Sequence, residues 1–179
     1  MMLSTHSQPE VTLTSDASGN WGCGAYAGKA WFMLPWSGPI QSLHITVKEL
    51  APIVVAAIIW GEHWRGMTVL ARCDNMAVVA IVNSGTARDP QTMNLMRCLT
   101  FIAAKRDFRM RAAHIKGTHN TLADALSRDN LKLFRSQFPQ AEQEPTPIPA
   151  AVLDLLLLHE PDWMARDWTE QWTSTWATP

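Results

Sequence analysis

Three strand-like segments open the chain before any helical segment appears, and this order limits the folds available to it more than any other feature. Val11–Ser15 alternates apolar and hydroxyl residues, and two further strands, Trp21–Ala27 and Ala30–Trp36, are joined around Gly28 and Lys29. Helical and strand-like segments then alternate: helix Thr46–Arg65, strand Met67–Cys73, helices Asn75–Val82 and Gln91–Lys105, strand Phe108–Ile115 and helix His119–Arg128. This order predicts an α/β fold, with a mixed five-stranded sheet and helices on both faces.

The chain changes character near Leu131, because prolines break the following sequence into short pieces, at positions 139, 145, 147, 149 and 161. Within this part Ala150–His159 has the pattern of a brief amphipathic helix. Tryptophans then recur at positions 163, 168, 172 and 176, on one face of a helix. Such a stripe is typical of a helix that packs on another surface, and a base-stacking platform is the alternative. We expect an N-terminal extension over residues 1–10, a folded domain over 11–131 and a Pro/Trp-rich linker or tail over 132–179.

Composition excludes several classes of protein. Hydrophobic residues make up 47% of the chain and charged residues 17%, which is typical of a globular protein. The net charge is −1, so any nucleic-acid binding must depend on a local basic patch. The three cysteines have no zinc or CxxC spacing, which predicts reduced, buried thiols. The longest apolar run, Ala51 to Trp60, is too short to span a bilayer, and the polar start shows no signal peptide. We therefore expect an intracellular protein, in the cytoplasm or nucleus, with no membrane partner.

Four acidic residues stand in four different settings: Asp16, Glu49, Asp74 and Asp124. Three of them interrupt or end strongly apolar segments, where burial of an unpaired carboxylate is unfavourable. A fold that brings such groups together must neutralise them, and a divalent metal ion is the usual means. The set therefore predicts a Mg²⁺-dependent phosphoryl-transfer site.

Each aspartate also has a structural alternative. Asp16 precedes turn residues and suits the start of a turn. Asp74 follows a buried strand and suits the N-cap of the helix that begins at Asn75. Asp124 lies on the same helix face as Asn120 and suits a solvated helix position.

Glu49 has the most specific alternative, because Thr46 and Glu49 fit the S/T-x-x-E capping box, in which the glutamate bonds back to the cap. In that register Pro52 lies beyond the first helical turn and removes one hydrogen bond. A helix start nearer Lys48 would suit Pro52 better and would leave Glu49 free. The sequence leaves both interpretations open.

The segments around the four acids are TSDASGNWGCGA, KELAPI, CDNMAVV and HIKGTHNTLADALSR. Together they resemble the ribonuclease H family, and more narrowly the RNase H domains of retroelement reverse transcriptases. The last segment is the most specific, and is similar to the end of this domain in gypsy-type and DIRS/Ngaro-like elements. The resemblance covers about residues 11–131, which makes them the catalytic domain. The Pro-rich tail is similar to the region that joins RNase H to a tyrosine recombinase in DIRS-like polyproteins.

The resemblance implies a metal-dependent endoribonuclease that hydrolyses the RNA strand of RNA–DNA hybrids during reverse transcription. It implies two Mg²⁺ ions roughly 3.5–4 Å apart, with Mn²⁺ as a substitute. Asp16 is then the bridging ligand, Asp124 binds the attacking-side ion, and Glu49 and Asp74 bind the ion on the leaving-group side.

His119 is a further candidate catalytic residue, although it follows Thr118 in a shorter loop than that of cellular enzymes. Its alternative is a plain residue at the start of a helix. The candidate substrate-binding residues are Asn20, Asn75, Lys116, Asn120 and Arg128.

The segment between residues 82 and 91 is short and carries only Arg88 as a basic residue, so we expect the fold to lack the basic extra helix with which cellular RNases H hold hybrids. Retroviral-type domains also lack it and depend on neighbouring polymerase domains, so the resemblance implies two partners: the hybrid and the reverse transcriptase polymerase domain of the parent polyprotein. Two alternatives are a catalytically silent scaffold domain of such a polyprotein and a DDE-type integrase or transposase. The second is disfavoured because no glutamate lies between Glu62 and Glu142.

Overall fold

A computed structural model of the chain describes residues 10–157, and its centre is one five-stranded sheet with the order β3-β2-β1-β4-β5. The strands are β1 (Glu10–Ala17), β2 (Gly22–Ala27), β3 (Ala30–Pro35), β4 (Thr68–Cys73) and β5 (Arg109–His114). The first three strands pair antiparallel, whereas β4 runs parallel to both β1 and β5. The predicted mixed sheet is confirmed.

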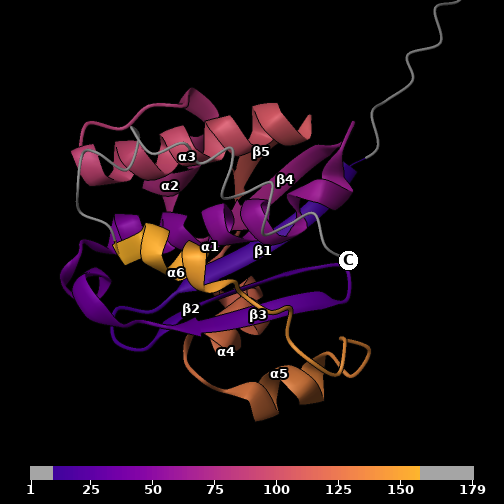
Figure 1. Cartoon of the computed structure of the whole chain (residues 1–179). Coiled ribbons are helices and arrows are strands. Elements are labelled where there is room, and N and C mark those ends of the chain that lie inside the picture. The colour runs from indigo at the N-terminus through magenta and orange to yellow at the C-terminus, as the bar shows by residue number, and fades with distance from the viewer. Residues whose placement is uncertain (1–9, 158–179) are drawn as a thin grey trace, which may run out of the picture.

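Helices cover both faces of this sheet (Figure 1). Three of them enclose the main apolar core on one face: α1 (Ile45–Trp60), α2 (Met76–Ser84) and α3 (Pro90–Arg106). Two helices enclose a second, smaller core on the other face: α4 (Thr121–Ser127) and α5 (Leu131–Gln137). The last helix, α6 (Ala150–Leu157), lies against α1 and against the 3-10 turn η1 (Gly38–Ser42).

The central helix α1 is buried at every position from Val47 to Ile58, because it lies between the sheet and α3. This explains why its sequence is apolar on all sides. The helix begins at Ile45, where the His44 side chain accepts a hydrogen bond from the Thr46 amide. Of the two helix starts that the sequence left open, the one nearer Lys48 is not realised. Pro52 lies inside the helix, where it removes one backbone hydrogen bond.

The loop of residues 85–89 joins α2 directly to α3, so this part of the chain has no room for the basic extra helix, as predicted. The three cysteines are buried and free, which also agrees with the sequence. Among the described residues, no helix combines the length and apolar character needed to cross a membrane.

The chain beyond Leu131 differs from the expected linker. Phe134, Ala141 and Val152 are buried, with at most 4% of their surface exposed. Backbone hydrogen bonds tie this segment to the edge strand β3, from the Glu142 amide to the Lys29 carbonyl and from the Thr146 amide to the Trp31 carbonyl. Residues 131–157 therefore belong to the folded unit and cover an edge that would otherwise be open to pairing. Residues 1–9 and 158–179, which include the tryptophan stripe, lie outside the described residues.

Phe134 gives a direct test of this packing, because its ring is fully buried and lies 5.2 Å from the Trp31 ring, centroid to centroid. We expect Phe134→Leu to lower the free energy of unfolding by about 1–2 kcal/mol, since part of the ring volume is left unfilled. The exposed neighbour Lys132, changed to alanine, is the control and should stay within about 0.5 kcal/mol of wild type. Urea unfolding measures both, and an unchanged midpoint for Phe134→Leu would contradict the assignment of α5 to the folded unit.

Candidate metal and catalytic site

Three of the four predicted acids meet at one edge of the sheet. Asp16 lies at the end of β1, Asp74 directly follows β4, and Glu49 projects from α1. In the parallel register of β1 and β4, Thr14 pairs with Arg72, so Asp16 and Asp74 continue side by side two residues further on. One carboxylate oxygen from each of the three acids lies within 4.8 Å of the others. This set of three residues is called the acidic cluster below.

The structural alternatives for two of these acids are not realised. Asn75, not Asp74, caps α2, and its side-chain oxygen accepts a hydrogen bond from the Val78 amide at 3.0 Å. The cap of α1 is His44, so Glu49 has no capping role and its side chain joins the cluster. The use of Asn75 as a cap also engages the amide oxygen that was a candidate for substrate binding.

The surroundings of the acidic cluster disfavour the ionised form of its carboxyl groups. Asp16 is 4% exposed and Glu49 is 5% exposed, and the Oε2 atom of Glu49 has no hydrogen-bond partner. Burial, followed by the charges of Asp16 and Asp74, raises the pKa of Glu49 to about 9. Burial raises the pKa of Asp16 to about 7, a hydrogen bond from Ser127 opposes this rise, and the charges of Asp74 and Asp124 add to it. A divalent cation would stabilise the ionised forms of Asp16 and Glu49, whose pKa values are raised, and would give the unpartnered oxygen of Glu49 a ligand contact.

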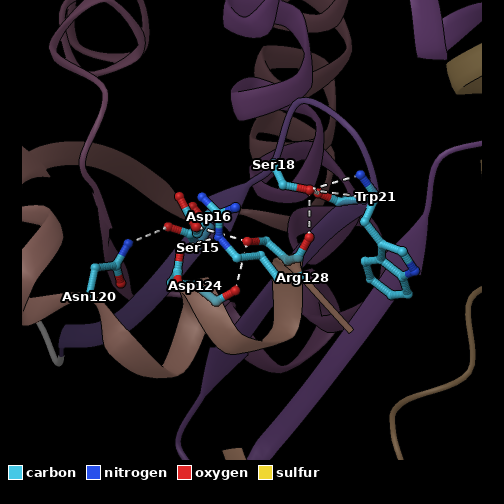
Figure 2. Close-up of polar contacts among 9 residues, drawn as sticks. Ser15, Asp16, Ser18, Trp21, Asn120, Asp124 and Arg128 are labelled. Atoms are coloured by element: carbon cyan, nitrogen blue, oxygen red, sulfur yellow. Dashed lines mark hydrogen bonds and ion pairs between the residues drawn. The ribbon is translucent and has the colours of Figure 1, made fainter. Parts of the chain in front are cut away.

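Asp124 lies near the acidic cluster but is not part of it. Its Oδ1 atom accepts a hydrogen bond from Arg128 Nε at 2.8 Å, one helical turn further along the chain (Figure 2). Its charge still contributes to the raised pKa of Asp16. The structure thus brings three of the predicted ligands together and pairs the fourth with Arg128, a residue that the sequence assigned to the substrate.

Gly24 explains how α4 comes so close to Asp16. In the antiparallel register of β1 and β2, Gly24 lies opposite Asp16. A Cβ atom at Gly24 would lie 2.3 Å from the Cβ of Leu126, so any other residue would push α4 away from the sheet. The close approach that glycine permits brings Ser127 within hydrogen-bonding distance of Asp16.

The remaining candidates, His119, Lys116 and Asn20, are exposed. His119 and Lys116 belong to the loop that contains the 3-10 turn η3 (Gly117–His119). This loop passes the cluster closely, since a Cβ atom at Gly117 would lie 3.4 Å from Asp74 Oδ2. Asn20 is exposed in the turn between β1 and β2. The roles of these residues stay predictions.

Asn120, a predicted substrate contact, lies inside the protein, and its role toward the substrate stays a prediction. Asn120 is 2% exposed, and its Nδ2 atom donates to the Ser15 carbonyl at 3.1 Å (Figure 2). The side chain is committed to the protein interior, where it holds the start of α4 against β1. It therefore supports the strand that carries Asp16 and does not face solvent.

Two further residues lie near the site, and one of them, Ser127, was not found from the sequence. Ser127 donates to Asp16 Oδ2 at 2.9 Å. Lys48 is 4% exposed, and its Nζ atom donates to the Gly19 and Gln41 carbonyls at 2.8 and 2.7 Å, which fixes the β1–β2 turn next to the cluster. The only sequence signal for Ser127 was its place in the Ala-Leu-Ser-Arg run after Asp124.

No protein-family model matches the chain, and no curated protein matches it. Among solved structures, RNase H1 from the halophilic archaeon Halobacterium salinarum is similar, with a TM-score of 0.52 and 15% identity over 69% of this chain and 98% of that one. LC11-RNase H1 in complex with an RNA/DNA hybrid has a TM-score of 0.52 and 16% identity, over 69% of this chain and 96% of that one. LC11-RNase H1, isolated from compost by a metagenomic approach, also appears in a second structure, with a TM-score of 0.50 and 17% identity over the same shares of the two chains. The chain therefore has the ribonuclease H fold.

Proposed function

We propose that this chain is a metal-dependent ribonuclease H that hydrolyses the RNA strand of RNA–DNA hybrids. The observation that carries the proposal is the meeting of Asp16, Glu49 and Asp74 at the carboxyl edge of β1 and β4, with Asp124 beside them. In open α/β sheets this edge is where ligands bind. The similar LC11-RNase H1 binds an RNA/DNA hybrid, which supports the same class of substrate here.

The residues present fit a divalent cation such as Mg²⁺ or Mn²⁺. The acidic cluster offers three carboxylate oxygens within 4.8 Å of one another, and hard oxygen ligands are the ones that Mg²⁺ prefers. The orphaned Glu49 Oε2 would gain a partner on binding. A bound ion would activate water and stabilise the leaving oxygen of a phosphodiester. Asp124, whose charge acts on Asp16, would add a fourth carboxylate if its ion pair with Arg128 opened.

The chain's own residues favour a substrate held by its phosphates. Arg72 is exposed and shares the face of Asp16, because it pairs with Thr14 in the sheet register. Lys116 is exposed in the loop that passes Asp74. Cations at these two positions would contact phosphates of a substrate bound at the acidic cluster. Contacts to phosphates carry no information about the bases, so we expect little sequence specificity.

The finer assignment is an RNase H domain of a retroelement reverse transcriptase that acts inside the cell during reverse transcription. It is supported by the sequence HIKGTHNTLADALSR, whose Asn120, Asp124, Ser127 and Arg128 all make contacts in or beside the site. The direct connection between α2 and α3 favours a polymerase domain as the partner that holds the hybrid. We further propose that residues 158–179 lead toward a tyrosine recombinase in the parent polyprotein.

A cleavage assay tests the activity. The purified chain is incubated with a labelled RNA–DNA hybrid in Mg²⁺ and in Mn²⁺, with double-stranded RNA, double-stranded DNA and single-stranded RNA of the same sequence as controls. We expect cuts only in the RNA strand of the hybrid, slow because the basic helix is missing, and none in EDTA. A hybrid that stays intact at high enzyme concentration in Mn²⁺, with the chain folded, would favour the silent scaffold domain instead.

A further inference from the structure

Ser127 is a fully buried residue at the end of α4 whose hydroxyl lies between two oxygens. It is 2.9 Å from Asp16 Oδ2 and 2.8 Å from the Asp124 carbonyl. The second contact is the usual bond of a helical serine to the preceding turn. A hydroxyl has only one proton, and a carboxylate is the stronger acceptor. Whenever Asp16 is ionised, the proton of Ser127 is therefore directed to Asp16.

Ser127 itself has little freedom to move. Its carbonyl accepts a hydrogen bond from Ser18 Oγ at 2.7 Å, and Ser18 Oγ also accepts from the Trp21 and Gly22 amides at 3.1 Å each (Figure 2). At the other end of α4, Asn120 donates to the Ser15 carbonyl. The helix is thus fixed to β1 on both sides of Asp16. A donor held in this way fixes the plane of the carboxylate and, with it, the place of the second oxygen.

We propose that Ser127 is a positioning residue that orients the Asp16 carboxylate for a divalent cation. The inference rests on the proposed function, because it gives Ser127 a purpose only if the acidic cluster binds metal. Hydrogen bonds to the ligands of a metal fix ligand orientation, and their loss typically weakens metal affinity or activity by about 10–100-fold. The alternative is that Ser127 only satisfies local hydrogen bonds at the end of α4. That alternative predicts a change in stability without a change in metal affinity.

The test is Mn²⁺ binding to the purified chain, measured by calorimetry without substrate. We expect Ser127→Ala to bind Mn²⁺ about 10–100-fold more weakly than wild type. Ser127→Thr keeps the hydroxyl and should restore most of the affinity. Alanine is the better helix former, so Ser127→Ala should leave α4 intact, and thermal unfolding without metal checks this.

Ser15→Ala is the matched control, because Ser15 is also fully buried next to Asp16 but its hydroxyl has no hydrogen-bond partner. It should bind Mn²⁺ as wild type does. If Ser127→Ala fails to fold, Ser127→Cys replaces it, since the thiol is a weak donor and a soft ligand that Mn²⁺ disfavours. We expect weaker Mn²⁺ binding for this variant too.

Cleavage of the hybrid separates this inference from the proposed function. A wild-type chain that cleaves, with Ser127→Ala equal to it in Mn²⁺ affinity and in the metal concentration for half-maximal rate, would overturn the inference alone. A wild-type chain that binds Mn²⁺ but never cleaves, with weaker binding in Ser127→Ala, would overturn the function and support the role of Ser127. A wild-type chain without Mn²⁺ binding would overturn the inference.

Discussion

Asp74→Asn should slow cleavage of an RNA–DNA hybrid by about 10³-fold or more while the fold stays intact. The neutral amide keeps the shape of the side chain but removes one of the three carboxyl groups whose oxygens lie within 4.8 Å of each other. A bound metal ion contributes several kcal/mol of transition-state stabilisation, and each step of about 1.4 kcal/mol changes the rate tenfold. The helix cap is unaffected, because Asn75 supplies it. Single-turnover rates in Mg²⁺ measure the effect.

Asp107→Asn is the matched control for this prediction. Asp107 is exposed and follows α3, at the end of the sheet where β5 begins rather than at the edge that carries the cluster. Its backbone has a positive φ of 57°, which asparagine tolerates as well as aspartate does. We expect a cleavage rate within about twofold of wild type, since a surface substitution far from the acidic cluster has a small effect. Rates for Asp74→Asn and Asp107→Asn that are equal would contradict the role of the acidic cluster in cleavage.

The sequence predicts the meeting of Asp16 and Asp74 for a simple reason. Each residue ends an apolar strand, and neighbouring parallel strands end at the same edge of a sheet. Glu49 could not be decided in this way, because its capping box is also a local pattern. The structure resolves it through His44, which takes the cap and leaves the Glu49 side chain for the cluster. For Asp124 the local pattern is the one that the structure realises. Its partner Arg128 lies only four residues further along the chain, at the spacing of a helical ion pair.

The features that the sequence did not predict depend on contacts between distant parts of the chain. Asn120 reads as a polar residue at a helix start, but its partner is the carbonyl of Ser15, 105 residues away. Ser127 and Asp16 are separated by 111 residues. Prolines after residue 131 indicate irregular backbone, yet they do not reveal whether that backbone packs. Burial of Phe134 against Trp31 makes this segment part of the fold.

The stability of the metal-free protein should fall as the pH rises from about 5 to 9. In the folded, metal-free protein the pKa of Asp16 is raised to about 7 and that of Glu49 to about 9. Both groups ionise near pH 4 in the unfolded chain. Between pH 4 and the raised pKa of each group, the folded state holds a proton that the unfolded state has lost. The free energy of unfolding therefore decreases as the pH rises. The contribution of these two groups is greatest below about pH 4 and is lost as the pH passes through 7 for Asp16 and through 9 for Glu49.

Glu49→Gln should remove the larger part of this dependence. At pH 8 we expect the metal-free variant to be more stable than wild type by on the order of 2 kcal/mol, because one pKa unit corresponds to about 1.4 kcal/mol and partial solvation reduces the total. For a chain of this size that is roughly 4–8 °C in Tm. Glu62→Gln is the control, because Glu62 is exposed on the turn after α1 and should show the wild-type dependence.

Metal ions should restore the stability that the wild-type protein loses at high pH, but they should have little effect on Glu49→Gln. Cations bind the ionised carboxylates, so the rise in Tm on adding Mg²⁺ or Mn²⁺ should be larger at pH 8 than at pH 6. Glu49→Gln keeps only two of the three acids of the cluster, so its rise should be small at both pH values. Thermal unfolding in EDTA and in excess metal gives all four comparisons. A wild-type Tm that stays level or rises between pH 5 and 9 in EDTA would show that the cluster carries no electrostatic strain. A substitution that stabilises the empty protein while it abolishes cleavage is the result expected of a site whose charges are kept for a metal ion.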